Sequence, residues 1–145
     1  MKSANVYKRA NRLFLYAESR TTAGVWIASP PFIQIDTAAS LADLGRAVIA
    51  ALNGSQSEIP HPTKWGNLLD PLLEQAGVKS WETFMRKAQC LNVEADGAQL
   101  KFIPNRNLGK TEGFEQLKDK TDELPSTTSP DRIGAALLKG LSLCK

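Results

Sequence analysis

Short apolar runs separated by turn-forming residues occupy the first third of the chain and are typical of β-strands. They cover residues 12–17, 25–28 and 32–35, with Thr21–Gly24 between the first two runs. Because proline cannot donate to a strand ladder, Pro30–Pro31 predicts the end of the second strand. The spacing of the runs predicts a meander or a pair of hairpins.

Residues 40–54 carry the signals of an amphipathic helix. Ser40 is a favourable N-cap, and Asp43 stands where the acid of a capping box belongs. The apolar residues Leu41, Leu44, Val48 and Leu52 recur at helical spacing. Asn53–Gly54 predicts the end of this helix, because both residues tolerate a positive φ.

Shorter helices are predicted in the centre of the chain. Residues 65–76 follow the helical period and end at Gly77. Asp70–Pro71 interrupts this pattern and predicts the start of a separate short helix, since proline is favoured at a first helical position. Ser80 predicts the N-cap of the next helix. The apolar side of that helix consists of Trp81, Phe84, Met85 and Ala88.

The clearest hairpin lies between residues 91 and 103. Asp96–Gly97 predicts its two-residue turn, because a primed turn needs positive φ at its centre, and Pro104 closes it. The predicted inward face holds Leu91, Val93, Ala95, Ala98, Leu100 and Phe102. Residues 105–128 are polar and turn-rich, and Ser129–Pro130 predicts the start of a last helix. The buried side of that helix holds Ile133, Ala136, Leu137 and Leu141.

The first and last helices share residues at an offset of 89 positions. Ser40, Gly45, Ala47 and Leu52 match Ser129, Gly134, Ala136 and Leu141. Two interpretations stay open: two unrelated helices that use small residues for close packing, or a pseudo-repeat of strands followed by a helix. In both cases the sequence predicts an α+β fold, with antiparallel sheet of short strands and hairpins covered by amphipathic helices. We expect a single domain of residues 1–145.

Length and composition narrow the class of protein. A chain of 145 residues with 42% hydrophobic residues can bury a core without a metal or a disulfide. No apolar run approaches the roughly 20 residues that span a bilayer. No apolar segment follows the basic start of the chain, so no secretory signal is predicted. We therefore expect a cytoplasmic protein with no membrane partner.

No set of residues assembles a catalytic, cofactor or metal site. Gly109–Lys110–Thr111 resembles the end of a phosphate-binding loop, but Pro104 stands where that loop needs its first glycine. His61 is the single histidine, and Cys90 and Cys144 fit no metal or redox spacing. We expect no enzyme activity, no cofactor and no small-molecule substrate. A small enzyme centred on His61 stays an alternative.

The net charge of +3 arises mainly at the N-terminus. The basic residues Lys8, Arg9 and Arg12 lie there among the aromatic residues Tyr7, Phe14 and Tyr16. Aromatic side chains on a basic sheet can stack on bases, so a single-stranded nucleic-acid-binding domain is a further alternative. We favour a core position for these aromatic residues, and a charge this mild does not by itself indicate nucleic acid.

Several segments resemble the immunity proteins of bacterial contact-dependent growth inhibition (CDI) systems, of the CdiI type. The segment Leu44–Ser55 resembles the first helix of that family, and the segments Ser129–Leu137 and Leu141–Lys145 resemble its closing helix. The hairpin Leu91–Ile103 and the loop Gly109–Phe114 lie where the family has similar features. The resemblance spans nearly the whole chain, and it transfers no catalytic residue.

The resemblance implies an inhibitor that has no chemistry of its own. Such a protein binds the cognate C-terminal toxin domain of a CdiA-type effector, often a nuclease, and blocks its active site inside the producing cell. Nuclease surfaces tend to be basic, so we expect carboxylates to contact the toxin. The candidate toxin-binding residues are Glu112, Glu115, Asp119, Asp122 and Glu123, together with Trp65.

Overall fold

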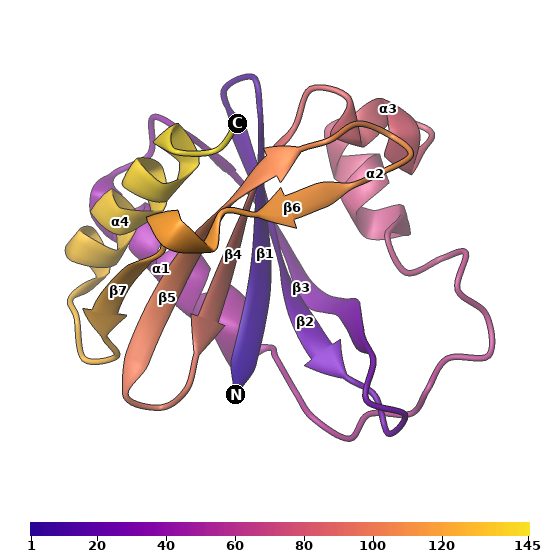
Figure 1. Ribbon diagram of the computed structural model, residues 1–145, viewed down its shortest axis with the longest axis horizontal. Coiled ribbons are helices and arrows are strands. Elements are labelled where there is room, and N and C mark those ends of the chain that lie inside the picture. Colours follow the sequence, from indigo (N-terminus) through magenta and orange to yellow (C-terminus); the bar gives the residue numbers. More distant parts are fainter.

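The computed structural model describes residues 1–145 as a twisted antiparallel sheet with helices on both faces (Figure 1). The strands are β1 (Lys2–Arg9), β2 (Arg12–Arg20), β3 (Trp26–Asp36), β4 (Gln89–Ala95), β5 (Gln99–Asn107), β6 (Phe114–Gln116) and β7 (Asp122–Pro125). The helices are α1 (Leu41–Asn53), α2 (Asp70–Ala76), α3 (Trp81–Met85) and α4 (Pro130–Ser142), with a 3₁₀ turn at Lys118–Lys120. The strand order is β3-β2-β1-β4-β5-β6, and β7 also pairs with β5. This confirms the predicted α+β class.

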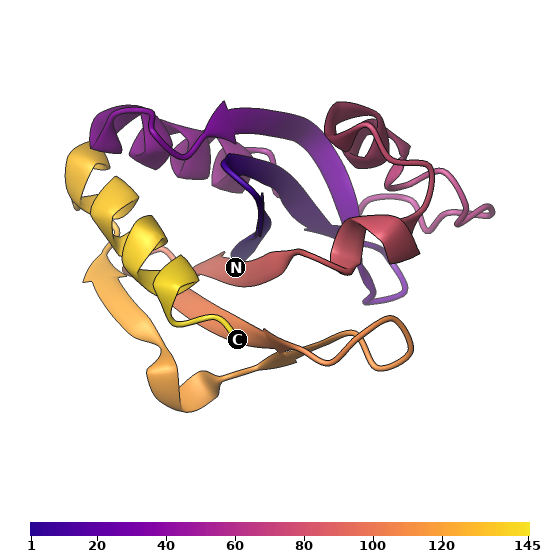
Figure 2. The ribbon, with the colours of Figure 1, turned by 90° about the horizontal axis from the view of Figure 1, so that it is seen from above.

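The main core lies between the sheet and the helices α1 and α4. Side chains alternate along each strand, so Ala4 and Val6 of β1 and Val93 of β4 face these helices and are fully buried. The helices contribute Leu44, Ala47, Val48, Ala51, Ile133, Ala136, Leu137 and Leu141 to this core. Figure 2 shows α1 and α4 on one side of the molecule and α2 and α3 on the other. None of the helices has the length and apolar character that crossing a bilayer requires.

The geometry supports the pseudo-repeat. The helices α1 and α4 each contain 13 residues; their first residues are 41 and 130 and their last are 53 and 142, an offset of 89 at both ends. Ala4 and Val93, which pair where β1 meets β4, are separated by the same offset. The order β3-β2-β1 on one side of this junction has its counterpart in β4, β5 and the short strands β6 and β7 on the other. The sheet therefore has an approximate two-fold axis through this pair.

The two repeated helices approach each other through two equivalent glycines. A Cβ on Gly45 would overlap the backbone carbonyl of Pro130, and a Cβ on Gly134 would overlap that of Leu41. The two contacts are reciprocal, because positions 41 and 45 in α1 correspond to 130 and 134 in α4. Glycine at both positions lets the first turns of the two helices pack backbone against backbone.

A second, aromatic core lies on the opposite face of the sheet. Tyr7, Phe14 and Tyr16 of β1 and β2 pack there against Leu72 of α2 and Phe84 of α3. The helices α2 and α3 contain only 7 and 5 residues. They cover the end of the sheet where β1 finishes and β2 begins, and they leave the rest of this face without a helix (Figure 1).

Strand β3 continues through Pro30–Pro31, where the sequence predicted an end. That prediction was wrong because β3 is an edge strand, and its register against β2 shifts between Tyr16 and Ala17. At an edge or a bulge, a proline costs no ladder hydrogen bond.

Gly54, the residue that ends α1, has a φ of −78° and not the positive value that the sequence predicted. The need for glycine at this position comes instead from the nearby prolines. A Cβ on Gly54 would overlap Pro31.

Three further local predictions need correction. Residues 65–69 are not helical, because α2 begins at Asp70 with proline in its first turn. The hairpin turn is centred one residue later than predicted: Asp96 N donates to Gln99 O at 3.2 Å, and Gly97 has a φ of 95°. Strand β5 runs past Pro104 to Asn107, and the polar segment that follows contains β6 and β7. Those two strands contain 3 and 4 residues, which is too short to show an alternating pattern.

Candidate functional site

The half of the second sheet face that α2 and α3 leave uncovered is polar. Along β1, Ser3 and Asn5 point to this face, whereas Ala4 and Val6 enter the main core. Neighbouring strands contribute Glu18, Asn92, Glu94, Lys101 and Gln116 to the same face. The alternation of side chains along the strands therefore places core residues on one face of the sheet and polar residues on the other.

Side-chain amides form a hydrogen-bonded chain across this face. Asn5 Nδ2 donates to Tyr16 Oη at 3.0 Å, and Asn92 Nδ2 donates to Asn5 Oδ1. Asn92 Oδ1 in turn accepts from Asn105 Nδ2 at 2.9 Å and from Gln116 Nε2 at 3.0 Å. Because these groups satisfy one another, they fix the side chains of β2, β1, β4, β5 and β6 relative to each other.

Three adjoining cavities that share lining residues lie along this face, and we call them together the trough. The largest has a volume of about 570 Å³ and shares Glu18 and Trp26 with a second cavity of about 280 Å³. The second shares Glu94 and Gln116 with a third cavity of about 330 Å³. The trough therefore crosses the sheet from β3 towards β7.

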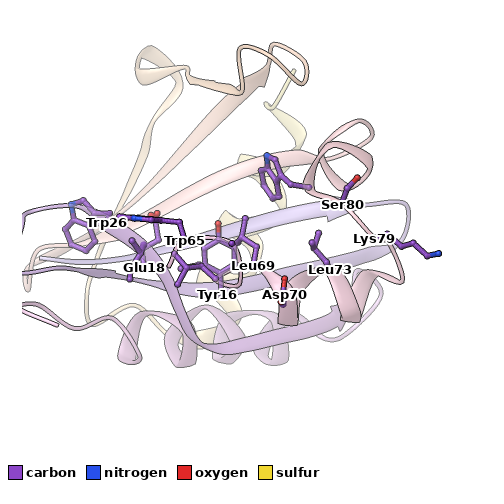
Figure 3. Close-up of a pocket in the computed structure, with 14 residues that line it drawn as sticks. Tyr16, Glu18, Trp26, Trp65, Leu69, Asp70, Leu73, Lys79 and Ser80 are labelled. Atoms are coloured by element: carbon purple, nitrogen blue, oxygen red, sulfur yellow. The ribbon is translucent and has the colours of Figure 1, made fainter. Parts of the chain in front are cut away.

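All three tryptophans of the chain line the largest cavity, which we call the tryptophan cavity. Trp26 comes from β3, Trp65 from the loop before α2 and Trp81 from α3. Figure 3 shows Trp26, Glu18 and Trp65 together at one end of the cavity, whereas Lys79 points away from it. The cavity thus combines aromatic walls with a carboxylate.

Glu18 is the most unusual group in the trough. Its Oε1 accepts a hydrogen bond from Ser3 Oγ at 2.9 Å. Burial raises the pKa of Glu18; the bonds from Ser3 and Asn5 oppose this, and the nearby charge of Glu94 adds to it. None of the four ion pairs in the structure includes Glu18. A carboxylate in such surroundings gains from a cationic partner.

The loop between α1 and α2 forms the outer wall of the tryptophan cavity. Backbone hydrogen bonds tie its first part to β2: Arg20 N donates to Gln56 O at 2.8 Å, and Ile59 N donates to Arg20 O at 3.1 Å. His61 Nδ1 lies 3.0 Å from Thr21 Oγ1, and its ring meets that of Trp65 edge-on at 5.1 Å between centroids. His61 therefore holds the loop in place, and its contacts do not form a catalytic arrangement.

Two of the residues predicted to contact a toxin lie in the trough. Trp65 lines the tryptophan cavity and is 49% exposed, and Glu123 lines the third cavity. The trough brings these residues together with Glu18, Trp26 and Glu94, which the sequence did not single out. A lone carboxylate in a strand carries no signal that distinguishes it from a solvated residue.

The other four predicted carboxylates lie outside the trough. Asp122 Oδ2 is 3.8 Å from Lys139 Nζ of α4, on the opposite face of the sheet. Glu115 alternates with Gln116 along β6 and so points away from the trough. Glu112 and Asp119 are exposed in the loop before β6 and in the 3₁₀ turn. The acidic segment is therefore spread over several surfaces.

The basic N-terminal strands do not form a platform for nucleic-acid bases. Tyr7, Phe14 and Tyr16 are only 4%, 2% and 4% exposed, because α2 and α3 cover them. The Arg9 guanidinium lies over the ring of Phe84, 5.2 Å from its centroid. The aromatic residues that the nucleic-acid alternative requires are thus part of the core.

Both cysteines are buried and free. Cys144 Sγ donates to the carbonyl oxygen of Cys90 at 3.2 Å. Burial raises the pKa of both thiols, with the neighbouring Cys144 adding to the rise at Cys90. Neither is therefore an activated nucleophile.

Comparison with known proteins identifies the family. The family model of CdiI, the CDI immunity protein, matches residues 2–144. No curated protein matches the sequence significantly. A solved protein of unknown function, NMB0488 from Neisseria meningitidis, has the same fold, with a TM-score of 0.79 and 18% identity over 99% of this chain and 95% of that chain. A CdiA-CT/CdiI toxin and immunity complex from Yersinia pseudotuberculosis contains a chain with a TM-score of 0.81 and 17% identity, over 99% of this chain and 97% of that one. The chain therefore belongs to the CDI immunity protein family.

Proposed function

We propose that this chain binds the cognate C-terminal toxin domain of a CdiA-type effector through the trough and neutralises it in the cytoplasm of the producing cell. The family match over residues 2–144 carries the proposal, and the Yersinia pseudotuberculosis structure of the same fold is a toxin and immunity complex. The trough is the surface best suited to a partner, because it is concave, lined by fixed polar groups and bordered by the exposed Trp65.

The toxin is a nuclease in this proposal, and the chain blocks its active site. Nucleases bind a polyanion and so present basic residues around their catalytic groups. The middle cavity of the trough offers Glu18 and Glu94 and no lysine or arginine side chain. Carboxylates placed this way compete with nucleic-acid phosphates for the same basic surface, even though the whole chain carries a net charge of +3.

The acidic segment from Glu112 to Glu123 flanks the trough in this proposal. Its exposed carboxylates, including Glu115 and Asp119, steer the toxin electrostatically, whereas Glu123 contacts it from the trough. Reversing Glu115, Asp119 and Glu123 to lysine is therefore expected to slow association and lower affinity, most strongly at low salt. Unchanged affinity in this triple variant would remove the acidic segment from the interface.

Purified components test the function directly. The chain and the C-terminal domain encoded immediately upstream are expected to co-purify as a one-to-one complex with an affinity well below micromolar. One equivalent of the chain is expected to abolish cleavage of RNA or DNA by that domain, and inhibition is expected to be competitive with the nucleic acid. Absence of a complex at micromolar concentration would contradict the proposal, and inhibition that excess nucleic acid cannot relieve would contradict active-site blocking.

A further inference from the structure

The tryptophan cavity contains a carboxylate, that of Glu18, with which no charged group of the chain pairs. Glu18 reaches it from β2, and its carboxylate accepts from the Ser3 hydroxyl at 2.9 Å and from the Asn5 side chain. A carboxylate has about four acceptor positions, so about half of them remain available to a partner. No lysine or arginine of this chain forms an ion pair with Glu18.

The residues that line the cavity determine which type of ligand group can bind next to the Glu18 carboxylate. Trp26, Trp65 and Trp81 line the cavity, and a tryptophan face is the most favourable aromatic surface for a cation. An anion would be repelled by Glu18 and by Asp70 in the same lining. A purely apolar group would bury Glu18 further without giving it a partner, which is costly.

A guanidinium fits this combination better than an ammonium. Its planar shape stacks on an aromatic ring, and its parallel N–H groups can bind a carboxylate in a bidentate manner. It is also more weakly hydrated, so it loses less on entering a partly enclosed cavity. The volume of about 570 Å³ is large enough to admit a whole arginine side chain.

We propose that the tryptophan cavity receives an arginine side chain of the bound toxin domain, with Glu18 as its carboxylate partner and the tryptophans as its walls. This inference rests on the proposed function, because the toxin supplies the arginine. It adds a specific anchor, which is the kind of residue that dominates interface energies. The anchor also gives Glu18, which forms no ion pair within the chain, a charged partner.

Isosteric neutralisation of Glu18 is the first test. Glu18→Gln keeps the shape of the side chain and an oxygen that can accept from Ser3, but it loses the charge. Glu74→Gln is the matched control, because Glu74 is exposed on α2 and lies outside the trough lining. Calorimetric titration with the purified toxin domain is expected to show affinity at least tenfold weaker for Glu18→Gln and within twofold of wild type for Glu74→Gln.

A double-mutant cycle identifies the partner. Each arginine of the toxin domain is replaced by alanine and titrated against the wild-type chain and against Glu18→Gln. One arginine is expected to show a loss that largely disappears in the Glu18→Gln background, because the two groups interact. Trp65→Ala, which changes an exposed loop residue, is expected to weaken binding of the same arginine.

The outcomes separate the two proposals. If the wild-type chain forms no complex with the toxin domain, the proposed function fails. If the complex forms and Glu18→Gln binds as tightly as wild type, or if no toxin arginine is coupled to Glu18, the arginine pocket is wrong and the immunity function stands. Circular dichroism of the variants confirms that each is folded before its affinity is interpreted.

Discussion

Glu18, which we propose as a binding residue, also shows how a buried carboxylate can be costly for folding. Burial raises the pKa of this carboxyl group, and Glu94 adds to the effect, although Ser3 and Asn5 donate to the carboxylate. The folded protein therefore holds the Glu18 proton more tightly than the unfolded chain does. At a pH above its raised pKa, the charged carboxylate destabilises the fold relative to the unfolded state.

The raised pKa of Glu18 should make the free energy of unfolding depend on pH. Between the ordinary pKa of a glutamate and the raised pKa of Glu18, the native state binds more protons than the unfolded state, so the Glu18 contribution to stability falls as pH rises through that window. Glu18→Gln is therefore expected to be more stable relative to wild type at pH 7 than at pH 4. Urea unfolding of both proteins at the two pH values measures this difference. An equal difference at both would contradict it.

The residues of the trough were harder to predict than those of the core. Val48, Leu44 and Leu137 follow a helical period that any amphipathic helix shows, so the sequence placed them correctly. Glu18 and Trp26 meet across paired strands, and Trp65 joins them through a loop anchored by His61 and Thr21. Such a site depends on contacts between distant parts of the chain, which no local pattern encodes.

At the level of elements, the helix pair α1 and α4 is the most specific feature of the fold. Their boundaries were predictable, because Ser40 caps α1 by accepting from Asp43 N at 3.1 Å, and proline follows Ser129 at the start of α4. Strands β6 and β7 were missed because each is short and gains its stability by pairing with β5. Hairpins and capped helices carry local signals, whereas short edge strands do not.

Alanine at Gly134 tests the close contact between these helices. Helix propensity alone favours alanine over glycine by about 1 kcal/mol. The added Cβ would overlap the carbonyl of Leu41, and overpacking of this kind costs about 1–3 kcal/mol or more. We expect Gly134→Ala to lower the free energy of unfolding, and Gly45→Ala to do the same because of the pseudo-repeat.

Gly66→Ala is the control for these two variants, since no atom lies within 4 Å of its Cβ position. Chemical unfolding that shows Gly134→Ala to be as stable as wild type would contradict the backbone contact.

At the scale of the whole molecule, the two faces of the sheet have different roles. One face, closed by α1 and α4, carries the main core and the approximate two-fold symmetry. The other face breaks that symmetry, because α2 and α3 cover one end of it and leave the trough open at the other. The asymmetric insertion between the two repeats, from the end of α1 to the start of β4, supplies two of the three tryptophans.

Family membership confirms the resemblance found in the sequence and the expectation of an inhibitor that is not an enzyme. Helical strings of small and apolar residues were sufficient to suggest the family, because they encode the repeated helix pair. They gave no indication of the trough, the surface that we propose for toxin binding, because its residues lie on the opposite face of the sheet from both helices.

Growth of cells that express the cognate toxin domain is the most direct test of the central claim. The C-terminal domain encoded upstream is produced from an inducible promoter, alone or together with this chain. The account predicts growth arrest with the toxin domain alone and normal growth when the chain is also present. Arrest that persists although the folded chain is present in excess, or normal growth with the toxin domain alone, would contradict an immunity function.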